Sequence, residues 1–340
     1  MAGRKRVSAA VGFVAAVAIG LASLAGCAGG DGAGQDPGGA PGAVDDGMTT
    51  VGFVAVGPEG GWRNANEQAV RDAFSVGAGF ELLYAPAASP SDQASQLDAF
   101  AGFVDDEVDV ILLTATEASG WEASLGRARD AGIPVVLVDR GVEASEDLYA
   151  ARIAPDNFKV ALAVGLWAVE TFADGGKYFV LEGVPGLSVV QERNEGFDAI
   201  VGTAPGLTKV GAQTANWKTD EARSVIEAVL QANDNDLQLI FAQNDEMGLG
   251  AAQAVAAAGL DPGTDVKIAT IDGTTGALQA LAAGDLSFVA QYNPFFGDVV
   301  VDVVDQVLAG EPVQRNITVE SDTFASPEQG QAALDTGLGF

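Results

Sequence analysis

Apolar and polar positions along this chain follow one repeating rhythm from about residue 48 onward. A short run that is apolar throughout, such as TVGFVAVG at 50–57, is followed each time by a longer segment with one apolar face. The first half predicts strands at 50–57, 80–84, 108–114 and 134–138, with helices at 62–76, 91–103 and 121–131 between them. The rhythm resumes after Asn157 and predicts strands at 178–181, 208–213, 237–242, 266–271 and 288–292.

Strands that are apolar throughout and separated by helices are typical of parallel sheets covered on both faces. The segment from 48 to 340 is longer than one hydrophobic core usually serves, so two lobes are expected. We therefore predict an α/β fold of two doubly wound parallel-sheet lobes.

The first 27 residues have the pattern of a secretion signal. Three basic residues at 4–6 precede an apolar stretch, 7–24, which ends in Leu-Ala-Gly-Cys at 24–27. This ending is similar to bacterial lipoprotein signals and predicts a signal peptide over 1–26 with Cys27 lipidated as the new first residue. The alternative is an uncleaved membrane-spanning helix, because the apolar stretch could just cross a bilayer. With one cysteine in the sequence, no disulfide within the chain is expected.

Residues 27–47 are mostly Gly, Ala, Asp and Pro, which offer little to bury, so we expect a flexible tether. The whole chain carries 17 basic and 47 acidic residues, a net charge of −30. Such a chain repels nucleic acid, because binding to phosphates depends on Lys and Arg. It contains no His, which excludes His-based triads and His metal sites, and lipidation of Cys27 would remove thiol catalysis. We expect no cofactor, no metal and no enzymatic activity.

Polar and aromatic residues gather just after the predicted strands. Ligands of open parallel sheets bind beyond the carboxyl ends of the strands. The candidates there are Trp62, Arg63, Asp139, Arg140, Arg193, Trp217, Asn244, Asp272 and Gln291. Carboxylate and amide oxygens accept hydrogen bonds from hydroxyl groups, Arg donates to them, and an indole packs on the apolar face of a sugar ring. This set is suited to recognising a sugar.

Several of these residues also have structural explanations. Asn244-Asp245 could cap a helix, and we assign capping to Asp245, which leaves Asn244 facing the ligand. Asp272 before Gly273 could form an ordinary turn, and Arg193 could be a solvated helix residue. Trp121 and Trp167 are expected to pack inside the protein.

The chain from 48 to 340 resembles the periplasmic sugar-binding proteins of the ribose-binding type, and among them most closely the galactofuranose binders. The resemblance lies in VGFVAVGPEGGWR at 51–63, ASGWEASLGRARDAGIPVVLVDR at 118–140, Pro-Asp-Asn at 155–157, QERNEGF at 191–197, FAQNDEMGLGAAQAVAAAGL at 241–260 and ATIDG at 269–273. It implies that the nine candidate residues contact a sugar, Trp217 as a stacking aromatic. Two departures bear on the ligand. Trp62-Arg63 replaces an aromatic pair of the ribose binders and favours a ligand with an additional polar group, and Gln291 stands where the galactofuranose binders are expected to carry an acidic residue.

The resemblance also implies two lobes joined by three crossing strands, near 154–157, 274 and 291–294. The N-terminal lobe would then comprise 48–155 plus 275–292, and the C-terminal lobe 156–274 plus 293–340. The expected role is a monomeric, lipid-anchored binding protein that closes on a monosaccharide and delivers it to the permease of an ABC importer. A receptor that presents its ligand to a sensor kinase is the alternative. A third possibility is a glycoside hydrolase that uses Asp139 and Asp272. Against it, each of these carboxylates has a partner that suits the binding of hydroxyl groups.

Overall fold

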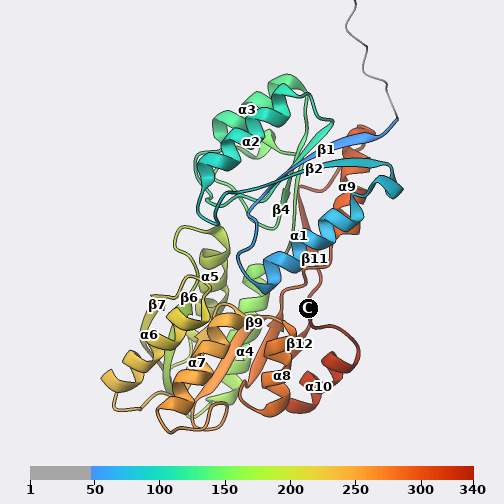
Figure 1. The fold of residues 1–340 in the computed structure, drawn as a ribbon. Helices are drawn as coiled ribbons and strands as arrows, with labels where there is room; N and C mark the ends of the chain where they lie inside the picture. Colours follow the sequence, from blue (N-terminus) through green and yellow to red (C-terminus); the bar gives the residue numbers. More distant parts are fainter. Residues whose placement is uncertain (1–46) are drawn as a thin grey trace, which may run out of the picture. The chain divides into compact units, whose positions relative to one another are not determined.

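The computed structural model describes residues 47–340, and the predicted signal peptide, the lipidation of Cys27 and nearly all of the tether lie outside them. The described residues form two α/β lobes, each built on its own sheet (Figure 1). None of the described helices is both long and apolar enough to cross a membrane.

The first lobe has a fully parallel sheet in the order β11-β5-β4-β3-β1-β2. Its strands are β1 (Thr49–Ala55), β2 (Phe80–Pro86), β3 (Val110–Leu113), β4 (Val135–Val138), β5 (Ala151–Pro155) and β11 (Asn316–Val319). The helices of this lobe are α1 (Gly61–Ala73), α2 (Gln93–Asp105), α3 (Glu122–Ala131) and α9 (Gly297–Leu308).

The second lobe repeats the design in the order β12-β10-β9-β8-β6-β7, with only β12 antiparallel to its neighbour. Its strands are β6 (Gly176–Glu182), β7 (Leu207–Thr214), β8 (Leu239–Ala242), β9 (Lys267–Asp272), β10 (Phe288–Gln291) and β12 (Thr323–Phe324). Its helices are α4 (Asn157–Thr171), α5 (Ser188–Val201), α6 (Thr219–Ala232), α7 (Asp245–Ala257), α8 (Thr275–Ala283) and α10 (Pro327–Asp335). The predicted fold of two doubly wound lobes is confirmed.

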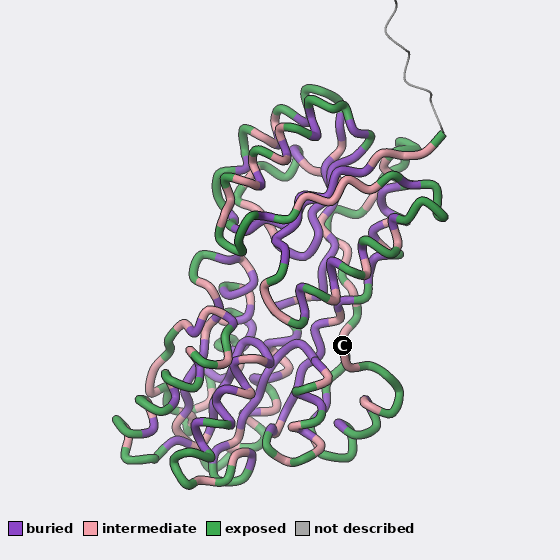
Figure 2. The backbone as a smooth tube through the Cα atoms, viewed as in Figure 1, coloured by how far each residue is buried: buried purple, intermediate pink, exposed green. Residues whose placement is uncertain are grey.

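The central strands are buried along their whole length because helices cover both faces of each sheet (Figure 2). Every residue of β3, β4 and β8 is buried, as their unbroken apolar runs predicted. The outer strand β7 has only partly exposed and exposed positions instead. The carboxyl ends of parallel strands lie along the same edge of a sheet. The candidate site lies beyond these edges of the two sheets.

The chain passes between the sheets three times within the described residues. It crosses from β5 to α4, from β10 to α9 and from β11 to β12. The first two crossings agree with the expectations near 154–157 and 291–294. The third was wrongly expected near 274 and lies instead between Val319 and Thr323.

The expected lobe boundaries need a matching correction. The segment 275–292 belongs to the second lobe, because β10 pairs in parallel with β9 and continues the strand–helix rhythm of that sheet. Residues 297–319 belong to the first lobe, where α9 packs on α1 and β11 pairs with β5. The close fit of α9 on α1 depends on Gly297, since a Cβ there would lie 2.3 Å from the carbonyl oxygen of Ala69.

Candidate functional site

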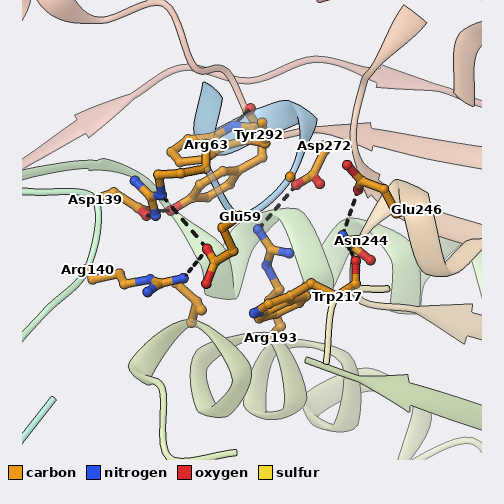
Figure 3. Close-up of a pocket in the computed structure, with 13 residues that line it drawn as sticks. Glu59, Arg63, Asp139, Arg140, Arg193, Trp217, Asn244, Glu246, Asp272 and Tyr292 are labelled. Carbon is orange, nitrogen blue, oxygen red and sulfur yellow. Dashed lines mark hydrogen bonds and ion pairs between the residues drawn. The ribbon is translucent and has the colours of Figure 1, made fainter. Parts of the chain in front are cut away.

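All the predicted site residues except Gln291 line one pocket between the two lobes, here called the cleft (Figure 3). The first lobe contributes the loop after β1, the first turn of α1 and the pair after β4. The second lobe contributes α5 and the ends of β7, β8 and β9. The lining residues are Glu59, Gly60, Trp62, Arg63, Asp139, Arg140, Val189, Arg193, Trp217, Asn244, Glu246, Asp272 and Tyr292.

Three of the residues that line the cleft have an unusual backbone conformation, with a positive φ. Asp139 has φ 65°, Trp217 φ 64° and Asp272 φ 138°, although none of them is glycine. Positive φ is uncommon for such residues and costs conformational energy, which the surrounding packing must offset. Each lies at or just after the carboxyl end of a strand, so the backbone turns sharply there and directs the side chain into the cleft.

The first-lobe side of the cleft holds two arginines paired with two carboxylates. Arg63 donates to Asp139, and Arg140 Nη2 donates to Glu59 Oε2 at 2.5 Å. The Tyr292 hydroxyl donates to the other oxygen of Asp139 at 2.7 Å. Burial alone would raise the pKa of Asp139, but Arg63, Arg140 and the Tyr292 hydrogen bond outweigh it and hold that pKa below its ordinary value. Asp139 is therefore an ionised acceptor.

Arg193 connects the second-lobe side of the cleft to the crossing segments. Its Nε donates to Asn157 Oδ1 at 2.9 Å, and its Nη1 donates to a backbone carbonyl, that of Gln243. Its Nη2 lies 3.6 Å from Asp272 Oδ1. The guanidinium also lies over the rings of Trp217 and Tyr292, with 5.8 Å and 4.8 Å to the ring centroids. Arg193 is only 4% exposed, so it is a buried organising residue and the solvated-charge explanation is wrong.

The capping assignment at 244–245 was also wrong. Asn244 is the N-cap of α7, since its Oδ1 accepts from Met247 N at 3.1 Å, and the same side chain faces the cleft. Its Nδ2 donates to Glu246 Oε2 at 2.7 Å. Asp245 points away from the helix start, and its carboxylate accepts from Gly273 N and Thr274 N at 2.8 and 2.6 Å. The Asx cap orients Asn244, and its amide nitrogen is held at the cleft by Glu246 Oε2 and by the Trp217 carbonyl oxygen at 3.4 Å.

Because of Asp245, we predict that the free energy of unfolding falls as the pH rises toward neutral. Burial, with the nearby Glu246 charge, raises the pKa of Asp245 to about 7 although Gly273, Thr274 and Thr270 donate hydrogen bonds to it. Between pH about 4 and about 7 the folded state thus holds a proton that the unfolded state has released, so the free energy of unfolding falls as pH rises. In Asp245→Asn the amide oxygen can accept from Gly273 N and Thr274 N while the amide nitrogen donates to the Thr270 hydroxyl, and urea unfolding at pH 8 should give a stability higher than wild type by up to roughly 4 kcal/mol. Parallel pH profiles of the two proteins would contradict this assignment.

A second buried carboxylate lies beside Asp245. Burial raises the pKa of Asp272 well above its ordinary value, and the charges of Asp245 and Glu246 add to this, whereas Arg193 opposes it. Arg193 thus offsets only part of the rise in the pKa of Asp272. Burial and the carboxylate of Asp139 raise the pKa of Tyr292 well above its ordinary value, so its hydroxyl stays a donor.

The two cleft tryptophans are held differently. Trp62 packs on Tyr292 with ring centroids 4.9 Å apart, and its indole N–H donates to the Tyr292 carbonyl. The six-membered ring of Trp217 lies against Gly183, where an added Cβ would be 1.9 Å from it. Trp121 is fully buried and packs with Phe100, and Trp167 stacks on Phe288, in agreement with their expected packing roles.

Three nitrogen donors of the cleft residues are buried without a hydrogen-bond acceptor among residues 47–340. They are Arg63 Nε, which has an ion-pair contact of 3.9 Å with Glu59 Oε2 but no hydrogen bond, Arg140 Nε and Trp217 Nε1. Buried donors in proteins are almost always paired, and each unpaired one costs about 1–3 kcal/mol. Three such donors on residues that line one cleft indicate a place for a ligand with several acceptor oxygens.

Gln291 is the predicted residue that lies outside the cleft. It ends β10, pairs in register with Asp272, and its Oε1 accepts from Asp322 N at 3.3 Å, next to the third crossing. The cleft is lined instead by the following residue, Tyr292. Successive side chains of a strand point to opposite faces, so a one-residue error at the strand end exchanged the two.

Sequence reasoning also missed Glu59 and Glu246. Both carboxylates follow strand ends, after β1 and β8, so the carboxyl-end rule could have included them. Among the described residues no group of three or more His, Cys, Asp or Glu side chains could hold a metal ion. The cleft is therefore a set of hydrogen-bonding groups and aromatic rings.

The chain is similar to known proteins both in sequence and in fold. Residues 51–312 match the family model described as a periplasmic binding protein domain. The chain is 46% identical over 328 residues to the fructose import binding protein of Bifidobacterium longum, covering 95% of this chain and 96% of the relative. It is 30% identical to the galactofuranose-binding protein of Escherichia coli, covering 84% and 90%. A crystal structure from Mycobacterium smegmatis in complex with β-D-fucofuranose is 35% identical, with a TM-score of 0.81 and coverage of 86% and 95%.

Proposed function

Since this chain belongs to the periplasmic binding protein family, we propose that it binds a monosaccharide in the furanose ring form and delivers it to an ABC importer. Sugar binding and the association with an ABC importer rest on the family itself. Its relatives are extracytoplasmic substrate-binding proteins of sugar importers, and the protein is a binding protein, not an enzyme.

The observation that carries the sugar assignment is the set of three buried N–H donors without acceptors, on Arg63, Arg140 and Trp217. A polyhydroxylated ligand supplies several oxygens within one small volume, and each can accept one of these bonds. The ionised Asp139 would accept hydroxyl protons in return. Because each unmade bond leaves a buried partner unpaired, such a site discriminates between sugars by single hydroxyl groups.

The furanose form is favoured by the relatives named above. Those relatives are an import binding protein for fructose, a galactofuranose-binding protein and a structure in complex with β-D-fucofuranose, and another related structure holds L-arabinofuranose at 32% identity and a TM-score of 0.80. Fructose readily forms a five-membered ring, so one shape of ligand fits this whole group. We therefore propose fructose or a galactofuranose-like sugar as the ligand, with Trp217 against the ring.

Binding would act through lobe closure. Residues of both lobes contact the same cleft, so a sugar that pairs with both sets favours the closed state by its differential contacts. The permease would then recognise the closed form. The import binding proteins among the relatives support a permease as partner in place of a sensor kinase. We also propose that Cys27 carries the lipid anchor, on the strength of the Leu-Ala-Gly-Cys ending.

Calorimetric titration with a panel of sugars tests the proposal. We expect saturable binding of D-fructose or a galactofuranoside, and much weaker binding of D-glucose, which is almost wholly pyranose in water. At a sugar concentration of about a hundred times Kd, the free energy of unfolding should rise by about 2.7 kcal/mol. Absence of binding and of thermal stabilisation with every sugar in the panel would refute the function, and preferential binding of glucose would refute the furanose assignment.

A further inference from the structure

The first helix of one lobe begins against a carboxylate of the other lobe. Helix α1 starts at Gly61, and its N-cap residue, Gly60, has no side chain to accept from the free N–H groups of the first turn. Free N–H groups at a helix start need an acceptor, and the helix dipole favours a negative charge there. Glu246 Oε1 accepts from Gly61 N at 2.8 Å. Glu246 belongs to the first turn of α7, in the second lobe.

The same carboxylate is tied to the cleft by its other oxygen. Glu246 Oε2 accepts from Asn244 Nδ2 at 2.7 Å, and both residues line the cleft. One side chain thus joins a predicted sugar contact of the second lobe to the start of the helix that carries Trp62 and Arg63 in the first. Figure 3 shows Glu246 beside Asn244 at one end of the cleft.

The two glycines make room for this approach. A Cβ added at Gly60 would lie 3.1 Å from Glu246 Oε1, and one added at Gly61 would lie 3.3 Å from the same atom. Gly60 has φ −177° and Gly61 is helical, so neither position needs glycine for its backbone conformation. Glycine at these two positions allows the close contact with Glu246 of the other lobe, and this contact exists only while the lobes are together.

We propose that Glu246 is a closing residue: it caps α1 across the cleft and so stabilises the closed arrangement of the lobes while positioning Asn244. Its role in affinity rests on the proposed function, whereas its role in closure does not. When the lobes separate, α1 loses its cap, whereas the bond between Asn244 and Glu246 lies within the second lobe, so the open state forfeits one charge-assisted hydrogen bond.

Pulsed EPR distances test the closing role without any sugar. Spin labels at the exposed positions Asp98 of α2 and Gln231 of α6, in a Cys27→Ser background, report the separation of the lobes. In the sugar-free protein, Glu246→Ala should move the distance distribution toward longer values, and Gly60→Ala should do so to a smaller degree. An unchanged distribution in both variants would overturn the proposal, whether or not a sugar binds.

The matched control is Glu328→Ala, which removes an exposed first-turn carboxylate from α10 of the same lobe. It should leave the distances unchanged, and an equal shift there would overturn the proposal by assigning the effect to lost charge. If a sugar binds the wild type, Glu246→Ala should also weaken binding about fivefold, which corresponds to the ~1 kcal/mol cost of a lost helix cap placed on the closed state alone. If no sugar binds the wild type while the distances still shift, the proposed function fails and the closing role stands.

Discussion

Replacing Arg193 with alanine will lower sugar affinity more than about 100-fold and will also destabilise the protein. Among the residues that the structure describes, Arg193 is the only arginine with a nitrogen within 4.0 Å of an Asp272 carboxylate oxygen. Without Arg193, Asp272 is a buried carboxylate facing Asp245 and Glu246. Removing one partner of a buried charged pair typically costs 3–5 kcal/mol. Asn157 Oδ1 and the Gln243 carbonyl lose their donor as well. Calorimetry gives the affinity and urea unfolding gives the stability.

Arg193→Lys separates charge from geometry in the same experiment. Lysine keeps the positive charge but has no planar fork to reach Asn157, Gln243 and Asp272 together. We expect its stability to recover more than its affinity. A sugar affinity within threefold of wild type in Arg193→Ala would remove this residue from the binding site.

Replacing Gly183 with alanine will expel Trp217 from its position in the cleft. The new Cβ would lie 1.9 Å from the indole, so the ring must move, and with it the surface on which Arg193 lies. Gly183 does not have a positive φ, so the backbone itself tolerates alanine. Overpacking of this kind costs about 1–3 kcal/mol. We expect sugar affinity to fall at least tenfold, with a red shift of the tryptophan emission.

Two controls isolate the clash. Gly126→Ala lies in α3 with no atom within 4 Å of the new Cβ, and should leave affinity unchanged while raising stability by about 0.5–1 kcal/mol. In a Trp217→Ala background, Gly183→Ala should have little further effect, because the two positions act through one contact. Additive losses in the double variant would show that Gly183 acts on something other than Trp217.

The strand and helix rhythm was predictable because the central strands are buried on both faces and therefore read as unbroken apolar runs. Val110–Leu113 and Val135–Val138 are such runs, and both are strands. The short strands β11 and β12 carry no such signal. β11 is partly exposed at alternate positions and β12 has two residues. The sheet to which β10 belongs is a matter of long-range pairing, and no local pattern near residue 274 could decide it.

The site was predictable to the extent that it depends on strand ends. Asp139 follows β4 directly and Asn244 lies two residues after β8, and the rule that ligands bind beyond the carboxyl ends of strands placed both correctly in the cleft. The contact between Glu246 and Gly61 joins residues far apart in the sequence, and only the assembled lobes bring them together. Gln291 was expected in the cleft within a strand predicted over 288–292, whereas β10 ends at Gln291 and the cleft is lined by Tyr292, a difference of one residue at a strand boundary.

The path of the last crossing has a consequence for biosynthesis. β11 completes the outer edge of one sheet and β12 that of the other, and both come from the final part of the chain. Until residues 316–324 have left the ribosome, β5 and β10 are open edges, which invite pairing with other chains. Neither lobe can finish folding before this one segment is available, so both lobes stay incomplete together, and truncation just before β11 should promote aggregation.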